Sequence, residues 1–202
     1  MRSSFSSLDK IEFAKSALRK KKLHDAYNGF KSAVCLYGCA YCKLLNGELN
    51  EAKNLLESLE NSSSFVNWLL ILIEIIEGKK GKMPTYFQIR NFYEQDVEML
   101  FFYERYDFIS KIFQKTSYLA NFNMEVYKYN ARLLLNQGYL ADSEILIKKS
   151  LDICFKDPET HYMYGELLLK RNDIEKAKQE FQKAIRVNGT YYPSLIKLKE
   201  LT

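Results

Sequence analysis

One stretch of the chain is written twice at a fixed interval, and this repetition constrains the fold more than any other feature. Between Met124 and Tyr191, residues of matching type recur 34 positions apart. Small residues at fixed places let two helices approach closely, and larger apolar residues fill the space between them. The pattern therefore predicts pairs of antiparallel helices. The small pairs are Ala131/Gly165, Ser143/Ala177 and Ser150/Ala184, and the large pairs are Leu134/Leu168 and Ile147/Phe181.

Residues suited to helix ends also recur at matching positions, as Gln137-Gly138 and Arg171-Asn172. Glycine and asparagine readily adopt the left-handed backbone conformation that ends many helices. A helix-turn-helix unit of about 34 residues is typical of the tetratricopeptide repeat. We therefore predict two regular repeats, at 124–157 and 158–191, each with a turn at one of these pairs.

The predicted fold class is all-α, an α-solenoid of tetratricopeptide-type helical hairpins. A last helix starting at Tyr192-Pro193 is expected to cap the regular repeats, as terminal units of solenoids commonly do. Irregular repeats are expected N-terminal to residue 124. The whole chain, residues 1–202, is expected to form a single tetratricopeptide-repeat domain, a length that can bury a substantial core.

The N-terminal region shows the same kind of pattern in shorter form. Ser6 or Ser7 can cap a helix from Leu8 to about Lys20. The next helix begins near His24. From Ala26 to Ala52 there are only 26 residues, so this helix either is short or continues into Cys42 as one long element. We favour the short helix.

The middle of the chain departs further from the regular pattern. An apolar helix is predicted from Phe65 to Glu77, preceded by a loop and cap at Asn61-Ser62-Ser63-Ser64 and buried on more than one side. Between Thr85 and Asn123 the small residues of the repeat are replaced by larger ones, although the phase of the pattern persists. Helices in this region are therefore expected to lie further apart. The boundaries in 23–46 and 85–123 remain open.

Composition limits the possible functions. The net charge of +5 is small and the charges are interspersed, so neither nucleic acid nor a membrane is expected as a partner. No secretory signal is visible, and the most apolar window, Phe65 to Ile76, is shorter than the roughly 20 residues that span a bilayer. We expect an intracellular protein of the nucleus and cytoplasm, with reduced cysteines.

Three cysteines resemble the cluster motif of radical S-adenosylmethionine enzymes: Cys35, Cys39 and Cys42. Such a motif needs a loop after a strand of an α/β barrel, whereas here the spacing places the thiols on one face of a predicted helix. Buried cysteines acting as small apolar residues are the better interpretation. The two histidines, His24 and His161, lie in unrelated repeats, so no catalytic, metal-binding or cofactor-binding residues are expected, and no enzyme.

Binding surface remains as the main functional feature. In stacked helical pairs the first helices line a concave groove. The residues at the matching inward positions mix both charge signs, and they form the predicted groove: Glu125, Lys128, Arg132, Leu135, Glu159, Tyr162, Glu166 and Leu169. A second surface is predicted at the N-terminus, because a solenoid end cannot leave large apolar faces in water. Its residues are expected to meet a second copy of the chain: Phe5, Leu8, Ile11, Tyr27, Phe30 and Tyr37.

Several segments together resemble the amino-terminal part of the tetratricopeptide-containing scaffold subunits of the anaphase-promoting complex. The blocks that carry the resemblance, in chain order, are 33–42 leading into 46–56, the apolar helix with Trp68, 164–170, 181–185 and 191–195. The region 85–123 has no counterpart in that family. The resemblance implies a non-catalytic role in a mitotic E3 ubiquitin ligase, other subunits of that ligase as partners, and a homodimer in which the first helices enter the partner's groove.

Three functions follow from these observations. The first is the homodimeric scaffold of the mitotic ubiquitin ligase. The second is a monomeric tetratricopeptide adaptor that binds a peptide or helix in the groove around Lys128, Arg132 and Tyr162. The third is an iron-sulfur enzyme, which the helical setting of the cysteines disfavours.

Overall fold

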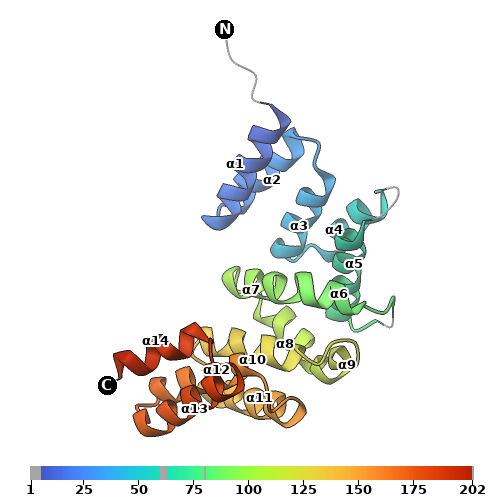
Figure 1. The fold of residues 1–202 in the computed structure, drawn as a ribbon. Helices are drawn as coiled ribbons and strands as arrows, with labels where there is room; N and C mark the ends of the chain where they lie inside the picture. Colours follow the sequence, from blue (N-terminus) through green and yellow to red (C-terminus); the bar gives the residue numbers. More distant parts are fainter. Residues whose placement is uncertain (1–5, 60–62, 80, 202) are drawn as a thin grey trace. The chain divides into compact units, whose positions relative to one another are not determined.

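A computed structural model describes residues 6–59, 63–79 and 81–201. Within these ranges every regular element is a helix and there is no strand, as the all-α prediction requires. The chain divides into two compact units, residues 1–115 and 116–202. Figure 1 shows the helices of both units. Of the predicted loop and cap at 61–64, Asn61 and Ser62 lie outside the described residues, and Ser63 is the extended residue directly before a helix that begins at Ser64.

Unit 2 contains the two regular repeats. It begins with the short helix α9, and two hairpins and a final helix follow. Helices α10 and α12 end 34 residues apart, at Asn136 and Lys170, and α11 and α13 begin 34 residues apart, at Leu140 and Ile174. Both predicted repeats and the capping helix are therefore confirmed. The bounds are α9 Thr116–Ala120, α10 Val126–Asn136, α11 Leu140–Ile153, α12 Pro158–Lys170, α13 Ile174–Val187 and α14 Tyr192–Glu200.

The small residues of the repeat act as predicted. A Cβ atom added to Gly165 would overlap the ring of Phe181, so only glycine lets α12 approach α13 this closely. In the preceding repeat the Ser143 hydroxyl donates to the Ala131 carbonyl at 2.8 Å. Both turns have the left-handed backbone predicted, with φ of 86° at Gly138 and 61° at Asn172.

Unit 1 begins with two hairpins. Helix α1 has the capping box at Ser6 and Asp9, which satisfies the free N–H groups of the first turn. Helix α2 ends at Ser32, so the favoured short helix after His24 is confirmed. The bounds are α1 Ser7–Arg19, α2 Leu23–Ser32, α3 Leu36–Asn46 and α4 Leu49–Glu57.

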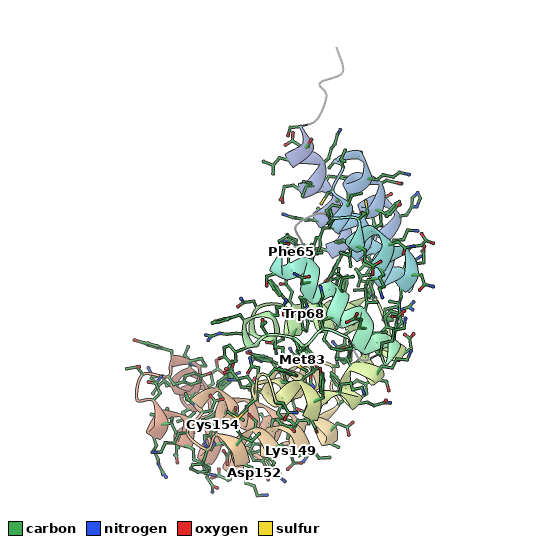
Figure 2. The ribbon with its side chains drawn as sticks, turned by 90° about the vertical axis from the view of Figure 1, so that its right-hand side faces the viewer. Phe65, Trp68, Met83, Lys149, Asp152 and Cys154 are labelled. Atoms are coloured by element: carbon green, nitrogen blue, oxygen red, sulfur yellow. The ribbon has the colours of Figure 1, made fainter. Side chains whose placement is uncertain are left out.

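Helix α5 (Ser64–Glu77) is the apolar helix predicted from the sequence, and it is buried on more than one side. Eight of its fourteen residues are buried, including Trp68, which is labelled with Phe65 in Figure 2. Helix α5 contacts α4, α6 and α8. A helix with apolar residues around most of its circumference must pack against other helices on several sides, and α4, α6 and α8 do so here.

The eroded middle region keeps the phase of the repeat. Helix α7 ends at Phe102 and α8 begins at Tyr106, each 34 residues before its counterpart in α10 and α11. These two helices pack less closely than the hairpins of unit 2, as the larger residues predicted. The sequence did not predict the π-helical turn η1 that precedes α7. The bounds are α6 Tyr86–Gln88, η1 Ile89–Tyr93, α7 Glu94–Phe102 and α8 Tyr106–Gln114.

The fold class is thus confirmed as tetratricopeptide-type, built from the helical hairpins that make up α-solenoids. In the described part of the chain, every helix is too short or too polar to cross a membrane.

Candidate interaction surfaces

The predicted groove of unit 2 is organised around Lys128 on α10. Its ammonium group lies 2.9 Å from Glu159, 3.0 Å from Asp157 and 3.2 Å from Glu125. The lysine is only 6% exposed. Burial alone would lower its pKa, but the carboxylates of Glu159 and Asp157 raise the pKa above the ordinary value. Lys128 is therefore a buried cation held by the protein's own acids.

Asp157 is the partner that the sequence did not reveal. It precedes α12 and caps that helix by accepting from the Glu159 backbone N–H at 3.1 Å. Burial would raise the pKa of Asp157, but the Thr160 hydroxyl and Lys128 hold it below the ordinary range. The sequence could have predicted the capping role of Asp157, because an aspartate directly before a predicted helix is a favoured N-cap residue.

The remaining groove residues are also engaged within the unit. Arg132 bonds Glu159 at 3.0 Å, and Glu166 lies 3.7 Å from Lys197 of α14. Leu135 is buried in the core of the first repeat and so does not line an open groove. The other two predicted residues are partly buried. Tyr162 contacts the rings of Phe181 and Tyr191, and Leu169 packs against the core cluster of Leu168, Ala177 and Phe181.

The charged groove residues therefore join neighbouring helices to one another. Lys128 and Arg132 of α10 both reach Glu159 of α12, which belongs to the next repeat. A peptide carboxylate that sought these cations would have to displace a paired acid. The groove's charges thus support the stacking of the two repeats.

The predicted N-terminal surface is only partly exposed. Phe5 lies outside the described residues. Leu8 is 68% exposed, whereas Ile11, Tyr27 and Tyr37 are half-buried. The structure corrects the prediction that Phe30 lies on the exposed N-terminal surface, because its ring is buried in unit 1 against Gly38 of α3. Phe30 therefore belongs to the core of the unit and not to an open face.

Tyr27 and Tyr37 have partners in unit 1. The Tyr27 ring lies 5.2 Å from the Lys43 ammonium group. The Tyr37 ring meets the ring of Phe65 edge-on at 4.8 Å between centroids. Both tyrosines thus help to pack neighbouring helices, and each keeps a part of its surface exposed.

The outer side of α1 and α2 forms a groove that the sequence did not single out. Its volume is about 470 Å³, and Phe13, which is 59% exposed, forms part of its wall. The sequence feature that could have revealed this groove is Phe13, an aromatic residue among charged residues on the exposed side of α1. The lining residues are Asp9, Lys10, Phe13, Asp25, Asn28, Gly29 and Ser32.

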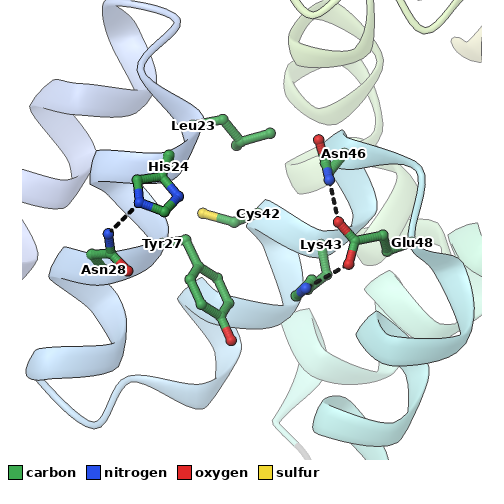
Figure 3. Close-up of a pocket in the computed structure, with 8 residues that line it drawn as sticks. All are labelled: Leu23, His24, Tyr27, Asn28, Cys42, Lys43, Asn46 and Glu48. Atoms are coloured by element: carbon green, nitrogen blue, oxygen red, sulfur yellow. Dashed lines mark hydrogen bonds and ion pairs between the residues drawn. The ribbon is translucent and has the colours of Figure 1, made fainter.

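A second cavity, of about 280 Å³, lies between α2 and α3 (Figure 3). Its polar groups are already bonded: His24 to Asn28 at 2.9 Å, and Lys43 to Glu48 at 2.5 Å. Asn46 also donates to Glu48. The cavity is therefore a small polar gap between hairpins whose hydrogen bonds are met internally. The other lining residues are Leu23, Tyr27 and Cys42.

The cysteines behave as predicted for small apolar residues. Cys39 and Cys42 are buried on α3, and Cys35 is the residue before that helix. Burial raises the pKa of Cys42 to about 12, so its thiol stays protonated. Within the described residues, histidine, cysteine and carboxylate side chains do not come together in threes that could hold a metal ion.

His161 has a structural role that sequence spacing could not reveal. Its ring is buried between Glu180 of α13, 2.8 Å from Nδ1, and the carbonyl of Phe155, 2.9 Å from Nε2. Burial would raise the pKa of Glu180, but the bonds from His161 and Lys183 lower it. The histidine thus links α12 to α13 and to the preceding loop.

Comparison with known proteins gives similarity at the level of structure only. No protein-family model and no curated protein matches the sequence. Among solved structures, the chain is similar to YrrB, described as a TPR protein with an unusual peptide-binding site, with 15% identity, a TM-score of 0.43, and coverage of 96% of this chain and 92% of that one. It is also similar to TTC0263, a thermophilic TPR protein of Thermus thermophilus, with 12% identity, a TM-score of 0.40, and coverage of 97% and 98%.

Proposed function

We propose that the protein is a non-catalytic scaffold that holds other proteins together and forms a homodimer through its N-terminal repeats. The observation that carries this proposal is the outer face of the first hairpin. There Leu8 and Phe13 are largely exposed, beside a groove of about 470 Å³. Contiguous exposed apolar surface that is rimmed by polar residues marks protein interaction sites.

The assembly that we propose is a mitotic E3 ubiquitin ligase, the anaphase-promoting complex. The sequence blocks that resemble its scaffold subunits support this, and among those subunits they are most like cell division cycle protein 27. The blocks 33–42 and 46–56 meet at the α3–α4 hairpin, and 164–170 and 181–185 fall on α12 and α13. The partners would be the chain itself and other ligase subunits, in the nucleus and cytoplasm.

Two experiments test the two parts of the proposal. Light scattering of the purified chain should give the mass of a dimer at micromolar concentration, and the mass of a monomer would remove the homodimer. The tagged chain, isolated from the cells that make it, should carry ubiquitin-ligase subunits identified by mass spectrometry. Isolation without any such subunit, under conditions that preserve large complexes, would remove the ligase assignment and leave the dimer untouched.

A further inference from the structure

Three large apolar side chains are exposed close together at the start of α6. Met83, labelled in Figure 2, is 71% exposed, Tyr86 is 42% exposed and Phe87 is 67% exposed. The rings of Tyr86 and Phe87 meet edge-on, with 5.4 Å between their centroids. We call these three residues the α6 patch. Single exposed apolar residues are common on protein surfaces, whereas neighbouring ones that form a patch mark interaction sites.

Contacts on either side hold the α6 patch against α5. Before the patch, the Lys82 backbone N–H donates to the Glu74 carboxylate of α5 at 3.1 Å. After it, the Gln88 side-chain amide donates to the carbonyl of Ser64, the first residue of α5, at 3.1 Å. Pro84, inside the segment, is buried. The patch is therefore fixed in position before any partner binds, which reduces the entropy that binding would cost.

The π-helical turn η1 follows the α6 patch directly. A π turn holds one residue more than an α-helical turn, so it shifts the first turn of this helix relative to α7 by one residue, or about 100°. Ile89 and Tyr93, at the two ends of η1, are fully buried, while Tyr86 and Phe87 remain exposed. Because π turns are rare and are frequently found at functional sites, η1 is a second observation that points to this patch.

The charge around the α6 patch has one sign. From residue 78 to residue 93 the sequence contains basic residues and no acidic one. The Lys79 ammonium group pairs with Glu77 at 2.8 Å. Lys82 and Arg90 are exposed, and neither forms an ion pair with a carboxylate of the described residues. Arg90 lies one helical turn after the two aromatic residues of the patch and so borders it. A partner that covers the patch therefore gains from acidic groups beside its apolar surface.

These properties fit an amphipathic helix with acidic residues on both sides of its apolar stripe. The part of the chain that the structure describes has no strand, so an extended segment would find no sheet edge to pair with. A helix forms its own backbone hydrogen bonds and brings only side chains to the patch. An anionic membrane fits less well, because lipid-binding surfaces commonly carry about four to eight basic residues, and here Lys79 is already neutralised by Glu77.

We propose that the α6 patch binds an acidic amphipathic helix of a partner protein. Apolar residues of that helix cover Met83, Tyr86 and Phe87, and its carboxylates pair with Lys82 and Arg90. The inference rests on the scaffold role proposed above and adds the chemistry of one partner. It does not involve the outer face of α1, so this contact can fail while the homodimer stands.

The contact is expected to be weak. Three apolar side chains and two charges bury far less than the roughly 1,600 Å² of a standard interface. A dissociation constant of about 10 to 500 µM is the expectation for a contact of this size. Its strength is therefore measurable by direct titration.

The probe for this site is a synthetic helical peptide of about 15 residues, with leucines along one face and glutamates on both sides of them. A second peptide has lysines in place of the glutamates. Binding of each peptide to the full chain is measured by fluorescence anisotropy. We expect the glutamate peptide to bind at least about tenfold more tightly than the lysine peptide at low salt, and this preference to shrink as the salt concentration rises.

The first comparison is between Phe87→Ser and Phe155→Ser. Phe87 is 67% exposed and Phe155, on unit 2, is 64% exposed, so the two substitutions remove rings of similar exposure. We expect Phe87→Ser to weaken binding of the glutamate peptide by at least about fivefold and Phe155→Ser to leave it unchanged. Circular dichroism of each variant establishes that it is folded.

The second comparison tests the charges. The double variant Lys82→Glu with Arg90→Glu should prefer the lysine peptide, which reverses the preference of the unaltered chain. The control is Lys156→Glu with Arg186→Glu, two exposed positions on unit 2, and it should keep the original preference. A reversed preference is not expected from a merely structural effect of the substitutions.

Three results would overturn the proposal: equal affinity for the two peptides, unchanged binding by Phe87→Ser, or no binding of the glutamate peptide at about 1 mM. Binding to phosphatidylserine vesicles in place of the peptide, lost in Phe87→Ser, would assign the patch to a membrane and also overturn it. None of these results alters the solution mass or the co-isolated ligase subunits, which test the proposed function separately.

Discussion

Replacing Asp96 with asparagine should remove a large part of the pH dependence of this protein's stability. Asp96 lies on α7 and is only 9% exposed. Its carboxylate accepts hydrogen bonds from the Tyr41 hydroxyl of α3 at 2.8 Å and the Trp68 indole N–H of α5 at 2.7 Å. Burial raises the pKa of Asp96 from 3.8 to about 6, and these two bonds offset the rise only in part.

The sign follows from the protons bound in each state. Between pH 3.8 and about 6 the folded chain keeps a proton on Asp96 that the unfolded chain has released. The free energy of unfolding therefore falls as the pH rises through this window and becomes constant above it. The pKa difference of about 2, at about 1.4 kcal/mol for each pKa unit, amounts to about 3 kcal/mol. Tyr37 and Tyr41 stay protonated throughout, because burial and Asp96 raise their pKa values.

The assay is urea unfolding of the unaltered chain and of Asp96→Asn from pH 4 to pH 7.5. Trp68 is the single tryptophan, so its fluorescence reports directly on the surroundings of Asp96. Other groups titrate alike in both proteins, so the difference between the two free energies of unfolding isolates residue 96. Stability relative to the asparagine variant should fall by about 2.4 kcal/mol across this range, because a part of the full change of about 3 kcal/mol is already lost between pH 3 and pH 4.

A difference that stays constant with pH would refute the reasoning. It would mean that the bonds from Tyr41 and Trp68 hold the pKa of Asp96 near its ordinary value despite burial. If the unaltered chain instead became more stable than the variant as the pH rises, the hydrogen bonds from Tyr41 and Trp68 would lower the pKa of Asp96 by more than burial raises it. Tyr41→Phe gives an independent check, since removing one donor should raise the pKa of Asp96 further and move the transition to higher pH.

Three further predictions concern the packing of the repeats and whether the chain unfolds as one domain. Gly165→Ala should destabilise unit 2 by about 1 to 3 kcal/mol because its Cβ overlaps the Phe181 ring, whereas Gly189→Ala meets nothing within 4 Å and should be neutral in thermal melts. Lys128→Met should cost about 1 to 2 kcal/mol in urea unfolding by leaving the partly buried Asp157 without its cation, and Lys176→Met at an exposed pair should change stability by less than about 0.5 kcal/mol. If the chain is one domain as predicted, the tryptophan fluorescence and the circular dichroism transitions will coincide; separate transitions would indicate two independent domains.

The sequence predicted the features that depend on residues close together in the chain. Gly138 and Asn172 end helices through their own backbone preferences. The 34-residue spacing revealed the hairpins of unit 2, because small residues recur where those helices approach closely. Helices α7 and α8 keep the 34-residue phase although larger residues stand at the positions of the small ones.

Features that depend on distant partners were missed or misread. Asp96 lies in the polar stretch Glu94-Gln95-Asp96, and only the fold brings it to a tyrosine 55 residues away and a tryptophan 28 residues away. Lys128 had the position of a ligand-binding groove residue, yet its partner Asp157 lies 29 residues further on. Phe30 had the type of an interface residue, and Gly38 of the next hairpin buries it.

The use of charge within unit 2 bears on where binding takes place. Lys128 and Arg132 both pair with Glu159 of the following repeat, so the cations that would recognise an acidic peptide instead stabilise the stack. A peptide that drew Lys128 away from these acids would have to break several existing ion pairs of a buried lysine, at a cost that a short peptide could not easily offset. On α1, by contrast, the charged residues stand on an exposed face beside an open groove, where a partner would not have to break buried pairs. Substitutions on that face should therefore change association and leave folding intact, whereas substitutions in the groove of unit 2 should do the reverse.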